Sequence, residues 1–300
     1  MFSSRGSFML YDGAMGTMLQ KNGLAPGQRP DIMNITAPDT VESIHRMYVE
    51  AGSEIICANT FGANANALKA TGRSPGEIIG AGIAIAKRAA GSSAKVALDI
   101  GPVGQMLEPL GDLGYNEAYE LFKEQAVAGE TAGADFAAIE TMSDISELKA
   151  AMLAVSENTK LPILATMTFN NTGRTYLGYS SEDFAETAER LGAAAVGINC
   201  SLNPSEMIST AERIAGRTSL PVIIKPNAGL PDAETGLYDI GPAEFAAQMA
   251  ELVRAVEAAG IAGRSPGEPD ARRLIIIGGC CGTTPEYISE LRKTFINRKG

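Results

Sequence analysis

Short apolar segments alternate with longer amphipathic segments along the chain. Each short segment is rich in β-branched residues and largely apolar on both faces, as a strand buried in a parallel sheet must be. Eight such segments occur: FMLYDG (8–13), EIICANT (54–60), KVALDIGP (95–102), FAAIET (136–141), PILATMTF (162–169), AVGINC (195–200), VIIKPN (222–227) and LIIIGGCC (274–281). We therefore expect eight parallel strands.

The segments between these strands carry apolar side chains at helical spacing. In 41–52, for example, Val41, Ile44 and Tyr48 share one stripe, and 116–133 keeps its charges on another face. Glycines and Xaa-Pro pairs mark the expected helix boundaries: Gly52, Gly133, Gly192, Asn203-Pro204 and Thr284-Pro285. Eight strand–helix repeats predict an α/β fold of the (β/α)₈ TIM barrel type, with an open doubly wound sheet as the alternative.

Length, composition and charge narrow the classes of function. A chain of 300 residues, 45% hydrophobic and 20% charged, fits a single globular domain that spans 1–300. The net charge of −10, without a cluster of Lys and Arg, argues against binding to nucleic acid or to an anionic membrane. We find no signal peptide and no run of about 18 apolar residues, so we expect a cytoplasmic protein.

Polar residues end or follow the predicted strands. Catalytic groups of such barrels lie at the carboxyl ends of the strands, so these residues are the candidates for a site. They are Asp12, Asn59, Thr60, Asp99, Glu140, Thr168, Asn199, Cys200, Asn227, Cys280 and Cys281.

Three of the four cysteines belong to this set. Cys200, Cys280 and Cys281 offer three thiolates at one rim, which predicts a catalytic zinc site with an open fourth position. Flanking glycines at 278, 279 and 282 give the backbone the freedom to turn both adjacent sulfurs toward one ion. The alternatives are a buried apolar role, redox chemistry of the adjacent pair, and a phosphate-binding turn, although the turn lacks the lysine and spacing of a P-loop.

The fourth cysteine and the single histidine are interpreted as structural. Cys57 lies two residues before Asn59 on the same strand face, so its side chain should point into the barrel about 7 Å below the rim. His45 lies in the middle of a predicted helix, and we expect it to be partly exposed. Because it is the only histidine, Ser-His-Asp and Cys-His mechanisms have no support.

Two carboxylates, Asp12 and Glu140, end the first and fourth predicted strands. They suggest either a glycosidase-like acid pair or a site for a substrate ammonium group. Backbone N–H groups of the turn at 13–17 would at the same time suit a carboxylate. An amino-acid substrate beside a zinc–thiolate site would use both features.

These motifs resemble the homocysteine S-methyltransferase family, and in particular the N-terminal, homocysteine-binding barrel of cobalamin-dependent methionine synthase. The resemblance spans nearly the whole chain. The motifs that carry it are DGAMGT (12–17), NTFGAN (59–64), DIGPVGQ (99–105), IETMSDISELKAA (139–151), GINCS (197–201), KPNAG (225–229) and GGCCGTTP (278–285).

The resemblance implies a set of site residues. Cys200, Cys280 and Cys281 would bind zinc and carry the catalysis, with the sulfur of homocysteine as the fourth ligand. The amino-acid end of the substrate would be held by Asp12, Glu140 and the backbone of Gly13 and Ala14. The same pocket would be completed by Asn227, near the metal, and by Asn59 and Thr60.

The methyl donor is the least determined part of the function. The chain has no Asp-x-His-x-x-Gly cobalamin motif, because Ser43 stands two residues before His45, and a second barrel for folate does not fit within 300 residues. We expect a methylcorrinoid such as methylcobalamin, carried by a separate corrinoid protein or by separate cobalamin and folate modules, to supply the methyl group in methionine biosynthesis. S-methylmethionine and betaine are the alternative donors, and the absence of Trp counts against an aromatic cage for betaine.

Two other classes of function stay open from the residues. A zinc hydrolase would activate water at the open position, and a redox sensor would oxidise Cys280 and Cys281 to a disulfide. The segment 260–273, rich in Gly, Pro and charge, is expected to form a surface loop before the last strand.

Overall fold

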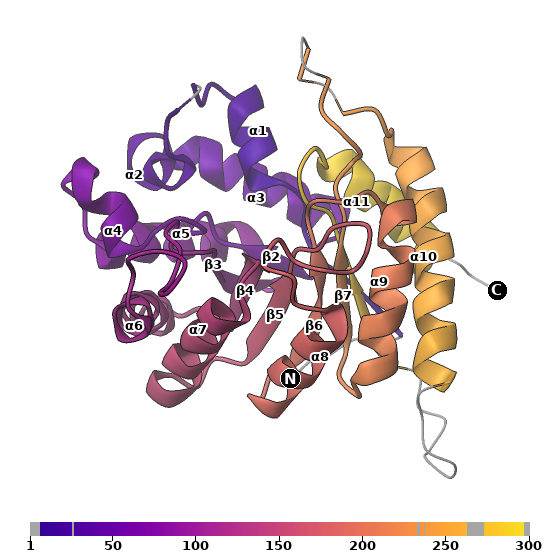
Figure 1. Ribbon diagram of the computed structural model, residues 1–300. Helices are drawn as coiled ribbons and strands as arrows, with labels where there is room; N and C mark the ends of the chain where they lie inside the picture. The colour runs from indigo at the N-terminus through magenta and orange to yellow at the C-terminus, as the bar shows by residue number, and fades with distance from the viewer. Residues whose placement is uncertain (1–6, 26, 233–234, 237, 263–272, 297–300) are drawn as a thin grey trace.

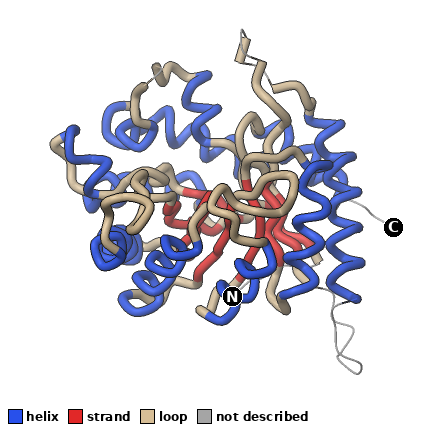
Figure 2. Tube along the Cα trace, in the orientation of Figure 1, coloured by secondary structure: helices blue, strands red, loops and turns tan. Residues whose placement is uncertain are grey.

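Eight parallel strands form a barrel at the centre of the protein, with helices around it (Figures 1 and 2). The computed structural model describes residues 7–25, 27–232, 235–236, 238–262 and 273–296. The strands are β1 (Phe8–Leu10), β2 (Ile55–Cys57), β3 (Lys95–Ile100), β4 (Phe136–Met142), β5 (Ile163–Met167), β6 (Ala195–Asn199), β7 (Val222–Lys225) and β8 (Ile275–Ile277). Each lies inside one of the eight predicted apolar segments, except that β4 continues one residue further, to Met142. The (β/α)₈ barrel is therefore confirmed and the open sheet is wrong.

The barrel is closed because β1 is bonded to a neighbouring strand on each side. The strand order is β1-β8-β7-β6-β5-β4-β3-β2, and β1 pairs with β8 in parallel. On the other side of β1, a parallel bridge joins Tyr11 to Ile55, and the Glu54 amide donates to the Leu10 carbonyl at 2.8 Å. These bonds complete the ring, so no sheet edge is left open there.

The helices follow the strands in the order that the sequence predicts. The longer ones are α3 (Pro38–Ala51), α5 (Pro75–Ala90), α6 (Tyr115–Thr131), α7 (Ile145–Asn158), α8 (Ser181–Arg190), α9 (Pro204–Arg217) and α10 (Pro242–Ala262). Shorter ones are α1 (Met15–Lys21), α2 (Met33–Thr36), α4 (Ala65–Leu68) and α11 (Pro285–Leu291), with the turns η1 (Pro30–Ile32), η2 (Lys69–Thr71) and η3 (Arg292–Ile296).

Local sequence accounts for several helix ends. Gly52 ends α3 at φ 117°, a backbone conformation that suits glycine. Asn203 starts α9 with a full capping box, in which its side chain and that of Glu206 satisfy each other's backbone amides, and Pro204 follows at the first helical position. The prediction of a loop over 260–273 is wrong for residues 260–262, because α10 continues to Ala262; residues 263–272 lie outside the described residues.

Two apolar cores hold these layers together. One lies inside the barrel and includes Met9, Ile55, Cys57, Leu164 and Ile276, and a larger one lies between the strands and the outer helices. Cys57 is therefore buried in the barrel interior, as predicted. In the described part of the chain, no helix has the length and apolarity needed to cross a membrane.

The prediction for His45 is wrong. Its side chain is fully buried on α3, and neither ring nitrogen has a hydrogen-bond partner among the described residues. Burial lowers the pKa of this imidazole to about 4, so it is neutral at physiological pH. His45 is thus a side chain of the packed core, and we assign it no catalytic role.

Candidate active site

Three cysteine sulfurs meet at the carboxyl end of the barrel. Cys200 follows β6, and Cys280 and Cys281 follow β8; the three Sγ atoms all lie within 4.8 Å of one another. The Sγ atoms of Cys200 and Cys281 are 3.8 Å apart. The structure therefore brings together all three residues predicted as metal ligands.

The backbone around the cysteines explains how adjacent residues can face one point. Cys200 and Ser201 both adopt φ 61°, which rotates the chain out of the strand direction directly after β6. The Cys200 amide donates to the Lys225 carbonyl, and the Cys280 amide donates to the Pro226 carbonyl at 2.7 Å. Both loops are thus fixed to the end of β7, and Gly282, at φ +84°, turns the chain away after Cys281.

The cluster fits a metal ion. Two sulfurs bound about 2.3 Å from one tetrahedral zinc ion lie about 3.8 Å apart, which matches the Cys200–Cys281 separation. Hydrogen bonds from Cys280 and Cys281 lower the pKa of Cys200, and the same sharing raises the pKa of Cys280. Three soft, closely spaced sulfur atoms are donors suited to zinc.

A cavity of about 380 Å³ opens beside the cysteines. It extends from the three thiols into the mouth of the barrel, and its volume suits a small substrate. Its wall includes Asp12, Gly13, Ala14, Cys57, Asn59, Asp99, Glu140, Thr141, Lys225 and the three cysteines. Most of the predicted substrate residues therefore share one cavity with the predicted metal site.

The cavity floor carries a buried lysine between carboxylates. Lys225 Nζ lies 2.8 Å from Glu140 Oε2 and 3.8 Å from Asp12 Oδ1. The same ammonium group lies 4.2 Å from the centre of the Tyr11 ring, at the distance of a cation–π contact. These neighbours raise the pKa of Lys225 against the lowering effect of burial, so the lysine stays charged.

Asp12 is held in place by the next strand. Its Oδ2 accepts a hydrogen bond of 2.7 Å from the Cys57 amide, whereas Oδ1 is buried and has no hydrogen-bond partner among the described residues. Burial raises the pKa of Asp12 to about 7, against the opposing effect of Lys225. Burial also raises the pKa of Asp99, whose carboxylate shares the floor with Glu140.

A distortion of β4 lies at and directly after Glu140. The register between β4 and β5 shifts between Ile139 and Met142, and Thr141 adopts φ 63°. Asn199 of β6 stabilises this bulge, because its Oδ1 accepts from the Thr141 amide and its Nδ2 donates to the Thr141 hydroxyl. Glu140 itself follows the regular alternation of the strand, because Phe136 and Ala138 lie in the interior core and Glu140 is the next residue on that face.

Asn59 and Thr60 make structural hydrogen bonds. Asn59 lines the cavity, but its Nδ2 donates to the Pro30 carbonyl and to Asn34 Oδ1. Thr60 is fully buried and outside the cavity wall; its hydroxyl donates to the Asp99 carbonyl and accepts from the Asp99 amide. Thr60 therefore fixes the end of β3 and, with it, the position of Asp99.

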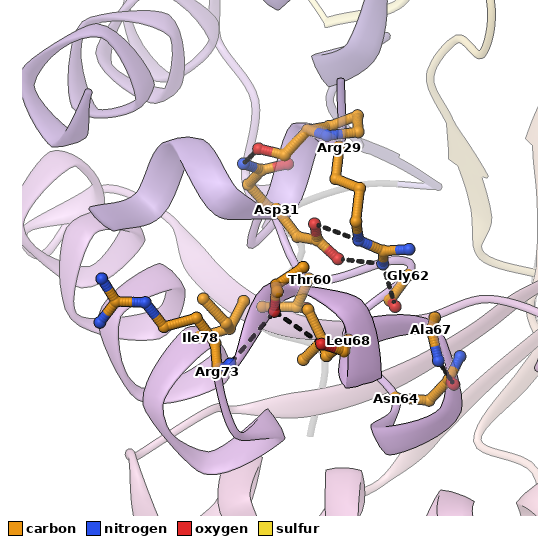
Figure 3. Close-up of polar contacts among 12 residues, drawn as sticks. Arg29, Asp31, Thr60, Gly62, Asn64, Ala67, Leu68, Arg73 and Ile78 are labelled. Carbon is orange, nitrogen blue, oxygen red and sulfur yellow. Dashed lines mark hydrogen bonds and ion pairs between the residues drawn. The ribbon is translucent and has the colours of Figure 1, made fainter. Parts of the chain in front are cut away.

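The loop after β2 is fastened to the segment before α2. Arg29 binds the Asp31 carboxylate and donates to the Gly62 carbonyl, and Asn64 caps α4 through the Ala67 amide (Figure 3). These contacts fix the Pro30 carbonyl that receives Asn59. The cavity wall on this side is thereby built from two tied loops.

The turn after β1 completes the wall, whereas Asn227, which was predicted to complete the same pocket, is not among the residues that line the cavity. A Cβ at Gly13 would lie 2.7 Å from Thr283 Oγ1, so the close approach of the two loops requires glycine. The Ala14 amide already donates to the Thr283 carbonyl at 3.2 Å. Asn227 is buried, its amide donates to the Leu202 carbonyl, and its Oδ1 has no hydrogen-bond partner among the described residues.

Comparison with known proteins identifies the family. A sequence model of the homocysteine S-methyltransferase family matches residues 9–295. The chain belongs to this family. It is therefore a methyltransferase, and the family resemblance read from the motifs is confirmed.

Curated relatives agree with this assignment. The chain is 32% identical to the methionine synthase of Mycobacterium tuberculosis (strain ATCC 25618 / H37Rv) over 97% of its own length, and 31% identical to that of Mycobacterium leprae (strain TN) over 94%. It spans about a quarter of the length of these relatives, 25% and 24% respectively.

A solved structure shares the fold. The metallated form of the homocysteine methyltransferase MmuM from Escherichia coli superposes with a TM-score of 0.78 and covers 96% of each chain at 21% identity. The apo form of the same protein gives a TM-score of 0.73. At this identity the likeness supports the barrel architecture.

Two residues of the site are not among the candidates from the sequence. Lys225 lies within an apolar segment, and Thr141 owes its place to a bulge; Asp99 is among the candidate strand ends, but without an assigned role. The signal for Lys225 was available, since a charged side chain inside a buried strand requires a charged partner. The partner itself, Glu140, is 85 residues away.

Proposed function

We propose that the protein is a zinc-dependent homocysteine S-methyltransferase that forms methionine. The observation that carries this proposal is the convergence of three cysteine sulfurs within 4.8 Å, at the open mouth of a barrel of this family. Cys200, Cys280 and Cys281 would hold the zinc ion. When bound, zinc supplies the positive charge that keeps an acceptor thiol in its nucleophilic thiolate form near neutral pH.

The remaining residues of the cavity bind and orient the acceptor. The acidic floor at Asp12 and Glu140 suits the ammonium group of homocysteine. Because the Ala14 amide is already bonded to Thr283, the substrate carboxylate would use other amides of the turn that begins at Gly13. Asn227, whose Oδ1 has no hydrogen-bond partner among the described residues, would lie beside the metal position, and Asn59 would form part of the cavity wall.

The methyl donor in this proposal is a methylcorrinoid carried by a separate protein or module. Large apolar side chains are exposed on loops that follow the barrel strands, around the same end as the cysteines: Phe61, Met106, Leu110, Tyr176 and Leu230. Exposed apolar side chains in such number favour contact with another molecule. Within the described residues, Phe61 is the one aromatic side chain that lines the cavity, which does not favour an aromatic cage for betaine.

Other parts of the proposal rest on the sequence. Residues 1–300 would act as one homocysteine-binding domain in the cytoplasm. S-methylmethionine and betaine are the competing donors. A zinc hydrolase would release product without a thiol, and a redox sensor would lose metal on mild oxidation without methyl transfer.

The test is methionine formation from L-homocysteine and free methylcobalamin by the zinc-loaded protein, with and without a chelator. We expect wild type and Cys57→Ala to form methionine, and the chelator to abolish this activity. We expect Cys281→Ala to form no methionine. Parallel reactions with S-methylmethionine and betaine rank the donors. Rapid methylation from betaine alone would contradict the corrinoid donor, and chelator-resistant product would contradict the zinc site.

A further inference from the structure

The loop between β7 and α10 is fastened beside one of the three cysteines. The Ala228 amide donates to the Cys281 carbonyl at 2.9 Å, and the Ile240 amide donates to the Ala228 carbonyl at 3.1 Å. The Tyr287 hydroxyl of α11 also donates to the Ile240 carbonyl, at 2.7 Å. The two ends of this loop are therefore held together next to Cys281.

One aromatic side chain of the loop covers the turn that follows Cys281. A Cβ at Gly282 would overlap the ring of Tyr238, so the ring lies directly against this glycine. The Tyr238 backbone forms an antiparallel bridge with Pro231, and its half-buried side chain packs against the larger apolar core. The contact with Gly282 is therefore fixed by both the loop and the core.

The turn itself is held through its backbone. The Gly282 amide donates to Thr17 Oγ1 at 3.1 Å. The Thr283 hydroxyl donates to the Cys280 carbonyl at 2.7 Å. In the described part of the chain, the Cys281 thiol has hydrogen-bond partners only in the other two cysteines. Its direction therefore depends on the conformation of the turn and on the groups that pack against the turn.

Glycine gives this turn a freedom that packing has to remove. Gly282 has a φ of +84°, a conformation that glycine adopts without strain, and its backbone has no side chain of its own to restrict rotation. Tyr238 fills the space that a side chain of residue 282 would need. The tyrosine is not among the residues that line the substrate cavity, so it acts on the turn from outside the cavity.

We propose that Tyr238 is a positioning residue for the metal site, because its ring, packed against Gly282, fixes the direction of the Cys281 thiol. This inference rests on the proposed function, in which the three cysteines hold zinc. Without the ring, the Cys281 thiol loses its alignment with the other two sulfurs, and a zinc ion leaves the site more readily.

The first measurement is the rate at which zinc leaves the reduced, zinc-loaded protein in an excess of the chromogenic chelator pyridylazoresorcinol. Tyr238→Ala should release zinc about tenfold faster than wild type, because loss of a group that orients a metal ligand typically costs about 10- to 100-fold in affinity. Tyr238→Phe keeps the ring and should release zinc at the wild-type rate. Tyr115→Ala, at an exposed tyrosine that begins α6, is the control and should also match wild type.

A spectrum separates a displaced ligand from a general loss of stability. Cobalt(II) in place of zinc gives absorption bands whose positions depend on the arrangement of the thiolate ligands. We expect these bands to shift in Tyr238→Ala and to stay unchanged in Tyr238→Phe and Tyr115→Ala. If Tyr238→Ala does not fold, Tyr238→Leu takes its place, with the same direction of change expected.

A double-mutant cycle tests the contact between the two residues. Gly282→Ala adds a methyl group that overlaps the Tyr238 ring and also strains the backbone, so this variant should release zinc faster than wild type. In a Tyr238→Ala background the overlap is absent, so Gly282→Ala should then have a smaller further effect. In a Tyr238→Phe background the overlap remains, and the effect should be as large as in wild type.

Three results would overturn the inference. They are equal zinc release and equal cobalt spectra for wild type and Tyr238→Ala, faster release from Tyr238→Phe than from wild type, and an effect of Gly282→Ala that is the same with and without the ring. Each of them leaves the zinc site in place, because wild type still retains its metal. If the wild type binds no zinc, the proposed function fails as well.

Discussion

The side chain of Asn199 holds Thr141 by two hydrogen bonds, at 2.9 Å from the Thr141 amide and 2.8 Å to the Thr141 hydroxyl. The same Oδ1 accepts a third bond from the Thr166 hydroxyl. Asn199 is fully buried at the end of β6, directly before Cys200. One side-chain amide therefore links the β4 bulge at Thr141, next to Glu140, to the strand that leads into Cys200.

The substitution Asn199→Ala should destabilise the protein, because it removes the hydrogen bonds between β6 and the bulge in β4. The change leaves the half-buried Thr141 amide without its acceptor and creates a small cavity, so we expect the free energy of unfolding to fall by about 2 to 3 kcal/mol. Urea unfolding followed by circular dichroism measures it. Asn171→Ala, at an exposed position, is the control and should change stability by less than about 0.5 kcal/mol. Equal effects of the two substitutions would contradict the role of the bulge.

Removal of one cysteine sulfur should release the metal. Cys281→Ala leaves two of the three thiols, and a site reduced to two protein ligands should lose zinc to a chelator that wild type resists. Metal content after dialysis against the chelator is the measurement. Cys57→Ala is the matched control, because this thiol bonds to Tyr11 inside the barrel and lies outside the three-sulfur cluster. A Cys281→Ala protein that keeps its full zinc content would contradict the assignment of Cys281 as a zinc ligand.

The sequence predicts the barrel and the cysteine cluster because both depend on local patterns. A short apolar segment followed by a polar residue identifies the end of a strand, and in a parallel barrel all such ends meet at one rim. Cys200 and Cys281 could therefore be brought together in prediction although 81 residues separate them. No further information on their side chains was needed.

The rest of the site depends on contacts that no local pattern encodes. The bulge in β4 is held by Asn199, which is 58 residues from Thr141, and Glu140 pairs with Lys225, which is 85 residues away. His45 is a different case, since Val41, His45 and Tyr48 recur at spacings of four and three on one buried stripe. The prediction of partial exposure followed the polarity of the imidazole. It was wrong because the position of His45 on this apolar stripe determines its burial.

His45 should make the protein sensitive to mild acid. Its pKa is about 4 in the folded protein and about 6.5 in an unfolded chain, so between these values only the unfolded state binds the proton. Stability is therefore lost as the pH falls from 6.5 toward 4, by up to about 3 kcal/mol. Glu42, on the same helix and paired with Arg46 and Arg88, is the charged group that acts on the imidazole, and it raises the pKa less than burial lowers it.

A leucine at this position tests the effect. His45→Leu removes the buried nitrogens and the titration together, so the variant should gain stability relative to wild type as the pH is lowered through this window. Urea unfolding of both proteins at several pH values between 4 and 7.5 gives the difference. Parallel curves for the two proteins would show that His45 does not contribute to acid sensitivity.

Gly197 sets the distance between the two strands that carry Cys200 and Lys225. A Cβ on Gly197 of β6 would lie 1.9 Å from the carbonyl oxygen of Ile223 on β7, and this neighbour is backbone that cannot rotate away. Gly197→Ala should therefore lower the free energy of unfolding by about 3 kcal/mol and weaken zinc retention, because β6 must move to relieve the clash.

Gly80→Ala in α5 is the control. A Cβ at Gly80 meets nothing within 4 Å, so this variant should instead stabilise the protein by about 0.5 to 1 kcal/mol. The midpoint of urea unfolding and the zinc content are measured for both variants. If Gly197→Ala has the same midpoint and the same zinc content as Gly80→Ala, the contact between β6 and β7 does not fix the cysteine site.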